Sequence, residues 1–473
     1  MNSRAVHHFI VLFVAGLIAG CSTYPEKVRG TKRRLINERR RPVAYSACSA
    51  SGEDKLLAWL EQGRLDQLQG RYVESSRSYR KAISFCDEQE EKAVIRIGKA
   101  VDSTQSVMMG NDKFIDYPIV GFERMMLHQL DAYNSLAIGD MDGFGVNVRH
   151  MERCRGTEVT MYKQYMAALE AKMGGKKVEA MKSSASYRNF MNDLERLAPG
   201  LSHSTDNAYG LYLIALYREA IGDLDDALKY YREIDRIWPN NSVVKQGIDH
   251  CSRKSKPKAG FGEVVVFYEE GFMPEKRTDI VRFYEDSSVL PTLYLEVPNY
   301  HEADCLPYDE GGQLFLVTAS SRRIWSKTTP FCDLAPLAVK AHEERMGGII
   351  ARKTLLAGIM SAMVSAQHWH IQSSNPIAEG ILLAGGLVVD GVTAFMVAAN
   401  EENDLRSWLL LPRQVQMARF SVKAGGPWNI VLKAPGAEKT IPVTVKSGKK
   451  TIVYCTSVPG RLEGFSACLD KIK

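Results

Sequence analysis

The densest group of side chains that could do chemistry lies in the last quarter of the chain. Asp404, Arg406 and Trp408 alternate there, directly after the acids Glu401 and Glu402. A carboxylate and a guanidinium can pair through two parallel hydrogen bonds, and an indole can cap such a pair. This arrangement is more often structural than catalytic, but it also marks a candidate pocket formed by Asp404, Arg406 and Trp408.

Other motifs of catalysis or metal binding are scarce. His368 and His370 would share one face of an extended segment, but a metal site needs three or four ligands and no acid or cysteine stands close. The sequence contains no Gly-x-Ser-x-Gly, no phosphate loop, no His-Glu-x-x-His and no Cys-x-x-Cys. We therefore expect a protein without a catalytic residue, metal or cofactor, and not an enzyme.

The first twenty residues have the composition of a secretory leader. Arg4 supplies positive charge, an apolar core runs from Phe9 to Ile18, and small residues precede Cys21. The string Leu17-Ile18-Ala19-Gly20-Cys21 resembles a bacterial lipobox, which implies cleavage after residue 20 and acylation of Cys21. The alternative, a signal anchor, would need about 17 or more apolar residues to span the bilayer.

The resemblance to bacterial lipoproteins implies a location at the outer membrane, facing the periplasm, because Ser22 stands where an Asp typically retains lipoproteins at the inner membrane. Several acyl chains make a nearly permanent anchor. We therefore assign residues 1–20 to a signal peptide and residues 21–50 to a lipid anchor with a basic tether.

The basic tether concentrates the charge of the chain. The net charge is +6 from 61 basic and 55 acidic residues, which is too small by itself to indicate a nucleic-acid partner. Eight basic residues against one acid lie between Lys27 and Pro42. This stretch is either a solvated linker or a contact to anionic lipid headgroups.

Export to an oxidising compartment makes disulfides the expected state of the cysteines. Nine cysteines less the acylated Cys21 leave eight, which allow 105 complete pairings. Cys455 and Cys468 flank the turn signal Pro459-Gly460, so this pair is the predicted disulfide.

Residues 51–253 predict a helical repeat domain. The spacing Trp59-x3-Gly63-x6-Gly70-x4-Ser75-x3-Tyr79-x2-Ala82 matches the 34-residue tetratricopeptide (TPR) pattern of small and aromatic positions. A second copy starts at Leu211, turns at Gly222 and ends at Pro239, and a degenerate third copy has Phe144 at an expected small position. An unrelated array of helical hairpins would look similar.

Residues 259–473 predict an α+β domain. Short apolar runs indicate strands at 263–268, 293–297, 314–317, 428–432, 441–445 and 451–455, and a helix is expected over 334–367. The later runs suggest a small antiparallel sheet. The apolar segment Ile377–Ala399 predicts a buried helical hairpin, because Asp390 near its middle is costly in lipid; the alternative is a membrane-dipping or oligomer-forming hairpin.

The order of these features resembles a family of functionally uncharacterised TPR-containing lipoproteins of Gram-negative bacteria. The resemblance rests on the lipobox, the repeats, residues 262–271 and above all the string Asp404-x-Arg406-x-Trp408-x3-Pro412. It implies no enzyme activity. Family members look like companions of small envelope lipoproteins, including activators of peptidoglycan synthases.

Together these observations predict a non-enzymatic periplasmic scaffold or adaptor whose partners are other envelope proteins or lipoproteins. Repeat arrays bind partners on a concave face, and aromatic side chains are enriched where binding is strongest. We therefore expect Tyr72, Tyr209, Tyr212 and Tyr217 to contact a partner. The alternatives are an envelope ligand-binding or enzymatic domain around Asp404, and a membrane-embedded oligomer built from Ile377–Ala399.

Overall fold

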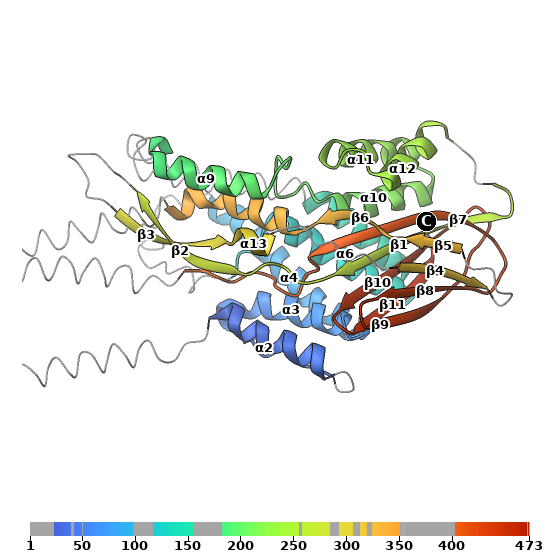
Figure 1. Ribbon diagram of the computed structural model, residues 1–473, viewed down its shortest axis with the longest axis horizontal. Coiled ribbons are helices and arrows are strands. Elements are labelled where there is room, and N and C mark those ends of the chain that lie inside the picture. The colour runs from blue at the N-terminus through green and yellow to red at the C-terminus, as the bar shows by residue number, and fades with distance from the viewer. Residues whose placement is uncertain are drawn as a thin grey trace, which may run out of the picture.

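The computed structural model confirms an α+β fold in which helices precede strands (Figure 1). The structure describes residues 23–38, 42–49, 51–97, 117–154, 182–254, 258–283, 293–305, 313–318, 324–350, 353, 403–470 and 472. The predicted signal peptide, Cys21, His368, His370 and the segment Ile377–Ala399 lie outside these residues.

The helices occupy most of the described chain up to residue 252, and beyond it Glu302–Cys305 and residues 335–350 are helical. The helices are α2 (Tyr24–Asn37), α3 (Lys55–Gln67), α4 (Tyr72–Ile97), α6 (Gly121–Ala137), α9 (Ala185–Leu197), α10 (Ala208–Ile221), α11 (Leu224–Ile237), α12 (Ser242–Ser252) and α13 (Glu302–Cys305), with a 3-10 turn at Gly52–Asp54. Residues 141–154 and 335–350 are also helical.

Successive helices form hairpins, and glycines explain how closely they pack. A Cβ atom on Gly63 of α3 would lie 2.5 Å from the ring of Tyr79 on α4, so only glycine allows this approach. Gly70 and Gly222 turn the chain between paired helices with φ of +73° and +88°, a region that glycine enters without strain. Phe144 is buried and its ring meets Tyr217 edge-on at 5.9 Å, so the large residue at this position is accommodated.

The strands of the described residues form three sheets. They are β1 (Phe261–Glu270), β2 (Lys276–Phe283), β3 (Leu293–Tyr300), β4 (Gln313–Thr318), β5 (Ile324–Lys327), β6 (Thr329–Asp333), β7 (Gln414–Lys423), β8 (Trp428–Ala434), β9 (Ala437–Val443), β10 (Lys450–Val458) and β11 (Arg461–Cys468). Their orders are β11-β10-β1-β7-β6, β5-β4-β8-β9 and the hairpin β2-β3.

The predicted antiparallel sheet is present, but one of its expected strands lies elsewhere. β8 and β9 pair antiparallel as expected, in register from Trp428 opposite Val443. Residues 451–455 belong to β10, which pairs in parallel with β1 at the centre of the five-stranded sheet. A parallel pair cannot be closed by a tight turn, so its partners come from segments far apart in the sequence.

The five-stranded sheet is buried on both faces. Side chains alternate along β1, so that Val265 and Phe267 join the core shared with the helices, whereas Val264 and Val266 join the core shared with the four-stranded sheet. Because both faces of the sheet are covered, β1 is a continuous apolar run and does not alternate between apolar and polar residues.

The helical and strand-rich parts share one hydrophobic core. The composition changes between α12 and β1, where the domain boundary is expected, yet a single cluster of buried residues runs from Leu56 to Leu469. Tyr133 of α6 stacks on Tyr454 of β10 with ring centroids 4.2 Å apart. The inner face of the helical array is therefore covered by the protein's own sheet.

Candidate functional site

The stretch expected to be a basic tether is largely a helix that packs on the body. α2 begins after Thr23, whose backbone N–H donates to the carboxylate of Glu26 at 2.9 Å, and this contact caps the helix start. Pro25, Val28, Thr31 and Leu35 form its buried face. The interpretation as a solvated linker is therefore wrong for residues 24–37, because four side chains on one face of the helix are removed from water.

Glu61 of α3 joins α2 to the strand-rich part. The hydroxyl of Tyr24 donates to Oε1 of Glu61 at 2.7 Å, and the backbone N–H groups of Leu409 and Leu410 donate to the same carboxylate at 2.7 and 3.0 Å. Burial raises the pKa of Glu61 to about 7, although these hydrogen bonds oppose the shift. Three segments far apart in sequence thus meet at one side chain.

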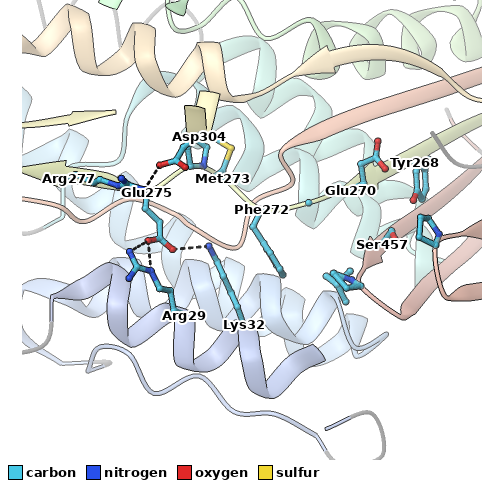
Figure 2. Close-up of a pocket in the computed structure, with 15 residues that line it drawn as sticks. Arg29, Lys32, Tyr268, Glu270, Phe272, Met273, Glu275, Arg277, Asp304 and Ser457 are labelled. Carbon is cyan, nitrogen blue, oxygen red and sulfur yellow. Dashed lines mark hydrogen bonds and ion pairs between the residues drawn. The ribbon is translucent and has the colours of Figure 1, made fainter. Parts of the chain in front are cut away.

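A pocket of about 730 Å³ lies between α2 and the connection from β1 to β2 (Figure 2). Charged residues line one part of it and apolar residues the other. The lining residues are Arg29, Lys32, Tyr268, Glu270, Gly271, Phe272, Met273, Pro274, Glu275, Arg277, Asp304, Pro435, Ser457, Val458 and Pro459.

Glu275 is the central acid of this pocket. Nε of Arg29 donates to Oε2 of Glu275 at 2.7 Å, and Nη2 of Arg29 lies 2.6 Å from the same oxygen. Nζ of Lys32 lies 3.6 Å from Oε1 of Glu275 and 5.1 Å from the centre of the Phe272 ring. Burial lowers the pKa of Lys32, and the charge of Glu275 opposes that shift without reversing it.

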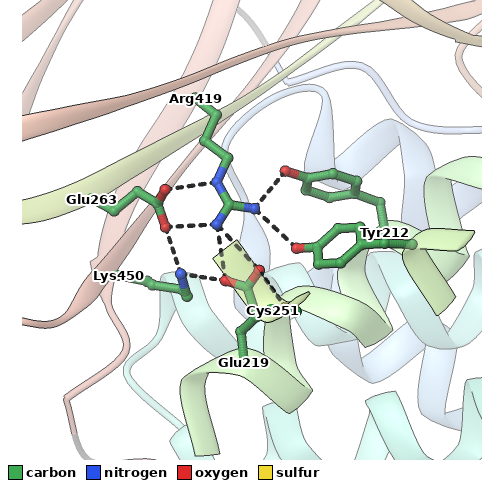
Figure 3. A network of polar contacts seen from close by, with 7 residues as sticks. Tyr212, Glu219, Cys251, Glu263, Arg419 and Lys450 are labelled. Atoms are coloured by element: carbon green, nitrogen blue, oxygen red, sulfur yellow. Dashed lines mark hydrogen bonds and ion pairs between the residues drawn. The ribbon is translucent and has the colours of Figure 1, made fainter. Parts of the chain in front are cut away.

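A second charge network locks α10 to the five-stranded sheet (Figure 3). Arg419 of β7 contacts Glu219 of α10 at 2.9 Å and Glu263 of β1 at 2.7 Å, while its Nη1 donates to Tyr212 and Tyr231. Lys450 of β10 contacts both carboxylates. Burial alone would raise the pKa of Glu263, but Arg419 and Lys450 outweigh it and bring the pKa to about 2. Each charge has an opposite partner, which is typical of a structural lock.

Where a pocket around Asp404 was expected, the guanidinium of Arg406 forms ion pairs with Asp404 and Asp54. Asp404 accepts two hydrogen bonds from the Arg406 guanidinium, at 2.8 and 2.9 Å, and Arg406 also contacts Asp54 at 2.8 Å. Trp408 is buried with its ring edge-on to Tyr79 at 5.9 Å. Burial would raise the pKa of Asp404, but Arg406 holds it below its ordinary value. The pocket described above is lined by other residues and does not include Asp404, Arg406 or Trp408.

Three of the four tyrosines expected to contact a partner contact the protein's own sheet, and the fourth, Tyr217, contacts the 141–154 helix. Tyr209, Tyr212 and Tyr217 are buried, and Tyr209 donates to Glu269 of β1 at 2.8 Å. Tyr72 is half-buried, with its ring edge-on to Phe465 of β11 at 5.2 Å. The prediction of a partner surface is therefore wrong for Tyr209, Tyr212 and Tyr217, because the sheet covers the first two and the 141–154 helix packs against the third.

The predicted disulfide between Cys455 and Cys468 is absent, and both thiols are free. In the β10–β11 hairpin Cys455 lies opposite Gly464, whereas Cys468 lies opposite Thr451. Four residues of strand separate the two cysteines, about 13 Å, and a disulfide needs Cα atoms within about 7 Å. Cys48, Cys251, Cys305 and Cys332 are free as well. Burial raises the pKa of Cys332 to about 12, so its thiol stays protonated and unreactive.

Several exposed apolar side chains that the sequence analysis did not single out lie at or near the turns between helices. Five large apolar residues are exposed in the described chain, and four of them lie near such turns: Val73, Ile138, Val146 and Ile221. We call these four residues the turn edge. Ile138 and Ile221 each precede the turn glycine, so an apolar residue directly before such a glycine was the available signal.

Two contacts between the helices bring neighbouring hairpins together near their turns. Asn134, near the end of α6, donates to Ser75, near the start of α4, at 2.8 Å. Arg149 of the 141–154 helix donates to Tyr217, near the end of α10, at 3.1 Å. In these two contacts, a helix that ends at a turn thus lies beside a neighbouring helix that begins after one.

No helix among the described residues has the length and apolarity to cross a membrane. Within the same residues, no three or more His, Cys, Asp or Glu side chains are grouped as a metal site would require. Comparison of the chain with family models, with curated proteins and with solved structures finds no match.

Proposed function

We propose that this chain is an outer-membrane lipoprotein that serves as a non-enzymatic periplasmic scaffold, with its body held against the membrane. The observation that carries the proposal is the position of α2. Its first residue, Tyr24, follows the lipobox Cys21 by three positions, and the helix is bound to the body through Glu61 and Glu275. An acyl chain on Cys21 would therefore hold the body close to the bilayer surface.

The outer face of α2 supports the same orientation. Lys27, Arg29 and Arg33 are exposed, while the opposite face is buried on the body. Basic side chains near an anionic membrane surface contribute about 1 kcal/mol each. Lipid anchoring and this basic face act together, since stable membrane attachment normally uses two signals.

Within this proposal the helical hairpins belong to a TPR-like array, and the turn edge replaces the covered inner face as the partner surface. The close approach of Gly63 to Tyr79 is what the repeat pattern requires of those positions. Apolar side chains such as Val146 and Ile221, exposed by about two fifths, suit burial against another envelope protein or lipoprotein.

The test has two parts, and the first concerns the anchor. Cys21→Ala should remove the lipid mass and release the protein from the outer-membrane fraction. Retention of the variant in that fraction with unchanged mass would overturn the anchoring proposal.

The second part concerns the partner surface. A photocrosslinking residue placed at 146 or 221 should give discrete adducts with one envelope protein in intact cells. The matched control is position 280 on β2, because Ile280 is 68% exposed and lies outside the turn edge. The same adducts from position 280, or none from 146 and 221, would contradict this assignment.

A further inference from the structure

We propose that the pocket between α2 and the β1–β2 connection binds a phosphate-bearing headgroup of an anionic membrane lipid, held by Lys32, Arg29 and Arg277. The inference deepens the proposed function and rests on it for the source of the ligand. The phosphate chemistry of the pocket itself depends only on the residues that line it.

The ammonium of Lys32 lies in the pocket with no oxyanion of the described residues at hydrogen-bond distance. Its side chain is 13% exposed and its ammonium faces the pocket, yet the carboxylate it faces there, Glu275, is 3.6 Å away, beyond a normal hydrogen bond. The Phe272 ring on its other side attracts a cation but accepts no strong hydrogen bond. A desolvated ammonium in this position gains most from one more oxyanion.

Arg29 and Arg277 provide further hydrogen-bond donors in the pocket. Arg29 holds Glu275 through Nε and Nη2, which leaves Nη1 clear of that carboxylate, and its side chain is 47% exposed. Arg277 enters from the opposite wall and contacts Asp304 through Nη2 at 2.8 Å. Guanidinium groups bind phosphate through two parallel hydrogen bonds, so both arginines can grip a ligand between them.

The pocket has a size and a place in the molecule that suit a lipid headgroup. The volume of about 730 Å³ accommodates a headgroup, and the apolar wall at Phe272, Met273 and Val458 suits the first methylenes of a lipid. Arg29 stands five residues after Tyr24, roughly 8 Å along the helix axis. The pocket thus lies within reach of the headgroup layer when Cys21 is acylated.

Glu275 acts in this scheme as an internal competitor. When no ligand is bound, its carboxylate pairs with Arg29 and lies near Lys32. An incoming phosphate must therefore displace Glu275 from Arg29. Glu275→Gln should therefore tighten phosphate binding, whereas a merely structural ion pair would show no gain.

The test measures lipid binding to the full-length detergent-solubilised protein by native mass spectrometry, with phosphatidylglycerol as probe and phosphatidylethanolamine as comparison. Lys32→Gln should weaken phosphatidylglycerol binding about tenfold, and Glu275→Gln should strengthen it severalfold. The matched control is Lys229→Gln on α11, because Lys229 is 72% exposed and lies outside the pocket and outside the basic face of α2. Equal losses in the Lys32 and Lys229 variants, or a loss in the Glu275 variant, would overturn the proposal.

A second titration with glycerol phosphate identifies the source of the ligand. Binding of glycerol phosphate as tight as that of the lipid would support the phosphate site but overturn the lipid as its ligand. Much tighter lipid binding would support the lipid. Membrane fractionation of Lys32→Gln separates this proposal from the proposed function, because an acylated variant should stay in the outer membrane even when the pocket is empty.

Discussion

At the residue scale, Arg419 and Glu263 show why buried charges in this protein bind the fold together. The side chain of Arg419 is 1% exposed and contacts Glu219 from the helices and Glu263 from the sheet. Removing one member of a buried ion pair leaves a charge without compensation, which costs about 3–5 kcal/mol. The network therefore makes the position of α10 on the sheet specific as well as stable.

Glu263 gives this network a dependence on pH. Its folded pKa of about 2 lies below the value of about 4.3 in an unfolded chain, so its ion pairs stabilise the fold fully above about pH 4.3. This stabilisation is lost as the pH falls towards 2. We expect Glu263→Gln to lower the free energy of unfolding at pH 7 and to flatten its decline between about pH 4.5 and 2.

Urea unfolding at a series of pH values measures this effect. Glu438→Gln is the matched control, because the ion pair of Glu438 with Lys433 is half exposed and should contribute little. A Glu263 variant with the wild-type slope would refute the assignment of the low pKa to this residue.

At the element scale, glycines decide how closely the helices of a hairpin approach. Gly63 meets Tyr79, and Gly247 of α12 meets Tyr231 of α11 in the same manner, with a built Cβ 2.6 Å from the ring. A large aromatic ring and a missing side chain fit together at both interfaces. Each hairpin thus depends on a residue whose only contribution is its small size.

Gly63→Ala should therefore destabilise the protein by about 1–3 kcal/mol, because the added methyl overlaps a ring that is fully buried. Gly30→Ala on α2 is the control, since a Cβ there meets nothing within 4 Å. It should stabilise α2 by roughly 0.5–1 kcal/mol through helix propensity. Chemical unfolding of both variants distinguishes packing from propensity, and equal effects would contradict the packing argument.

At the scale of the whole molecule, the helical and strand-rich parts are joined by buried contacts of every kind. Arg64 of α3 contacts Glu269 of β1 at 2.7 Å, with both side chains almost fully buried. Tyr454 of β10 also donates to Glu269, at 2.8 Å. Separating the two parts would break these contacts and leave buried charges and aromatic rings without their partners.

We therefore expect one cooperative unfolding transition for the described body. Helix content by circular dichroism and hydrogen exchange of the β1 and β10 amides should report the same midpoint. Glu269→Gln should lower that midpoint equally for both probes. A helical signal that survives loss of the strand amides would show that the two parts are independent after all.

Local patterns along the chain predicted the order of helices and strands, the turn glycines Gly70 and Gly222, and six of the eleven strands that the structure describes. These features depend on local periodicity and on backbone conformations that few residues adopt, so they are readable from short windows. The pairing of Asp404 with Arg406 was also readable, because the two residues are neighbours on the chain.

The surfaces that these elements pack against depend on the complete fold. The TPR-like spacing that predicts a tyrosine-lined surface is equally satisfied when that surface is covered, and here β1, β6 and β10 cover it. The register of β10 against β11 separates Cys455 from Cys468, although a turn lies between them. The pocket joins α2 to a loop about 240 residues away in the sequence, and no local pattern encodes such a meeting. Contacts between distant segments depend on the folded core as a whole, which explains why the architecture was predictable and the candidate site was not.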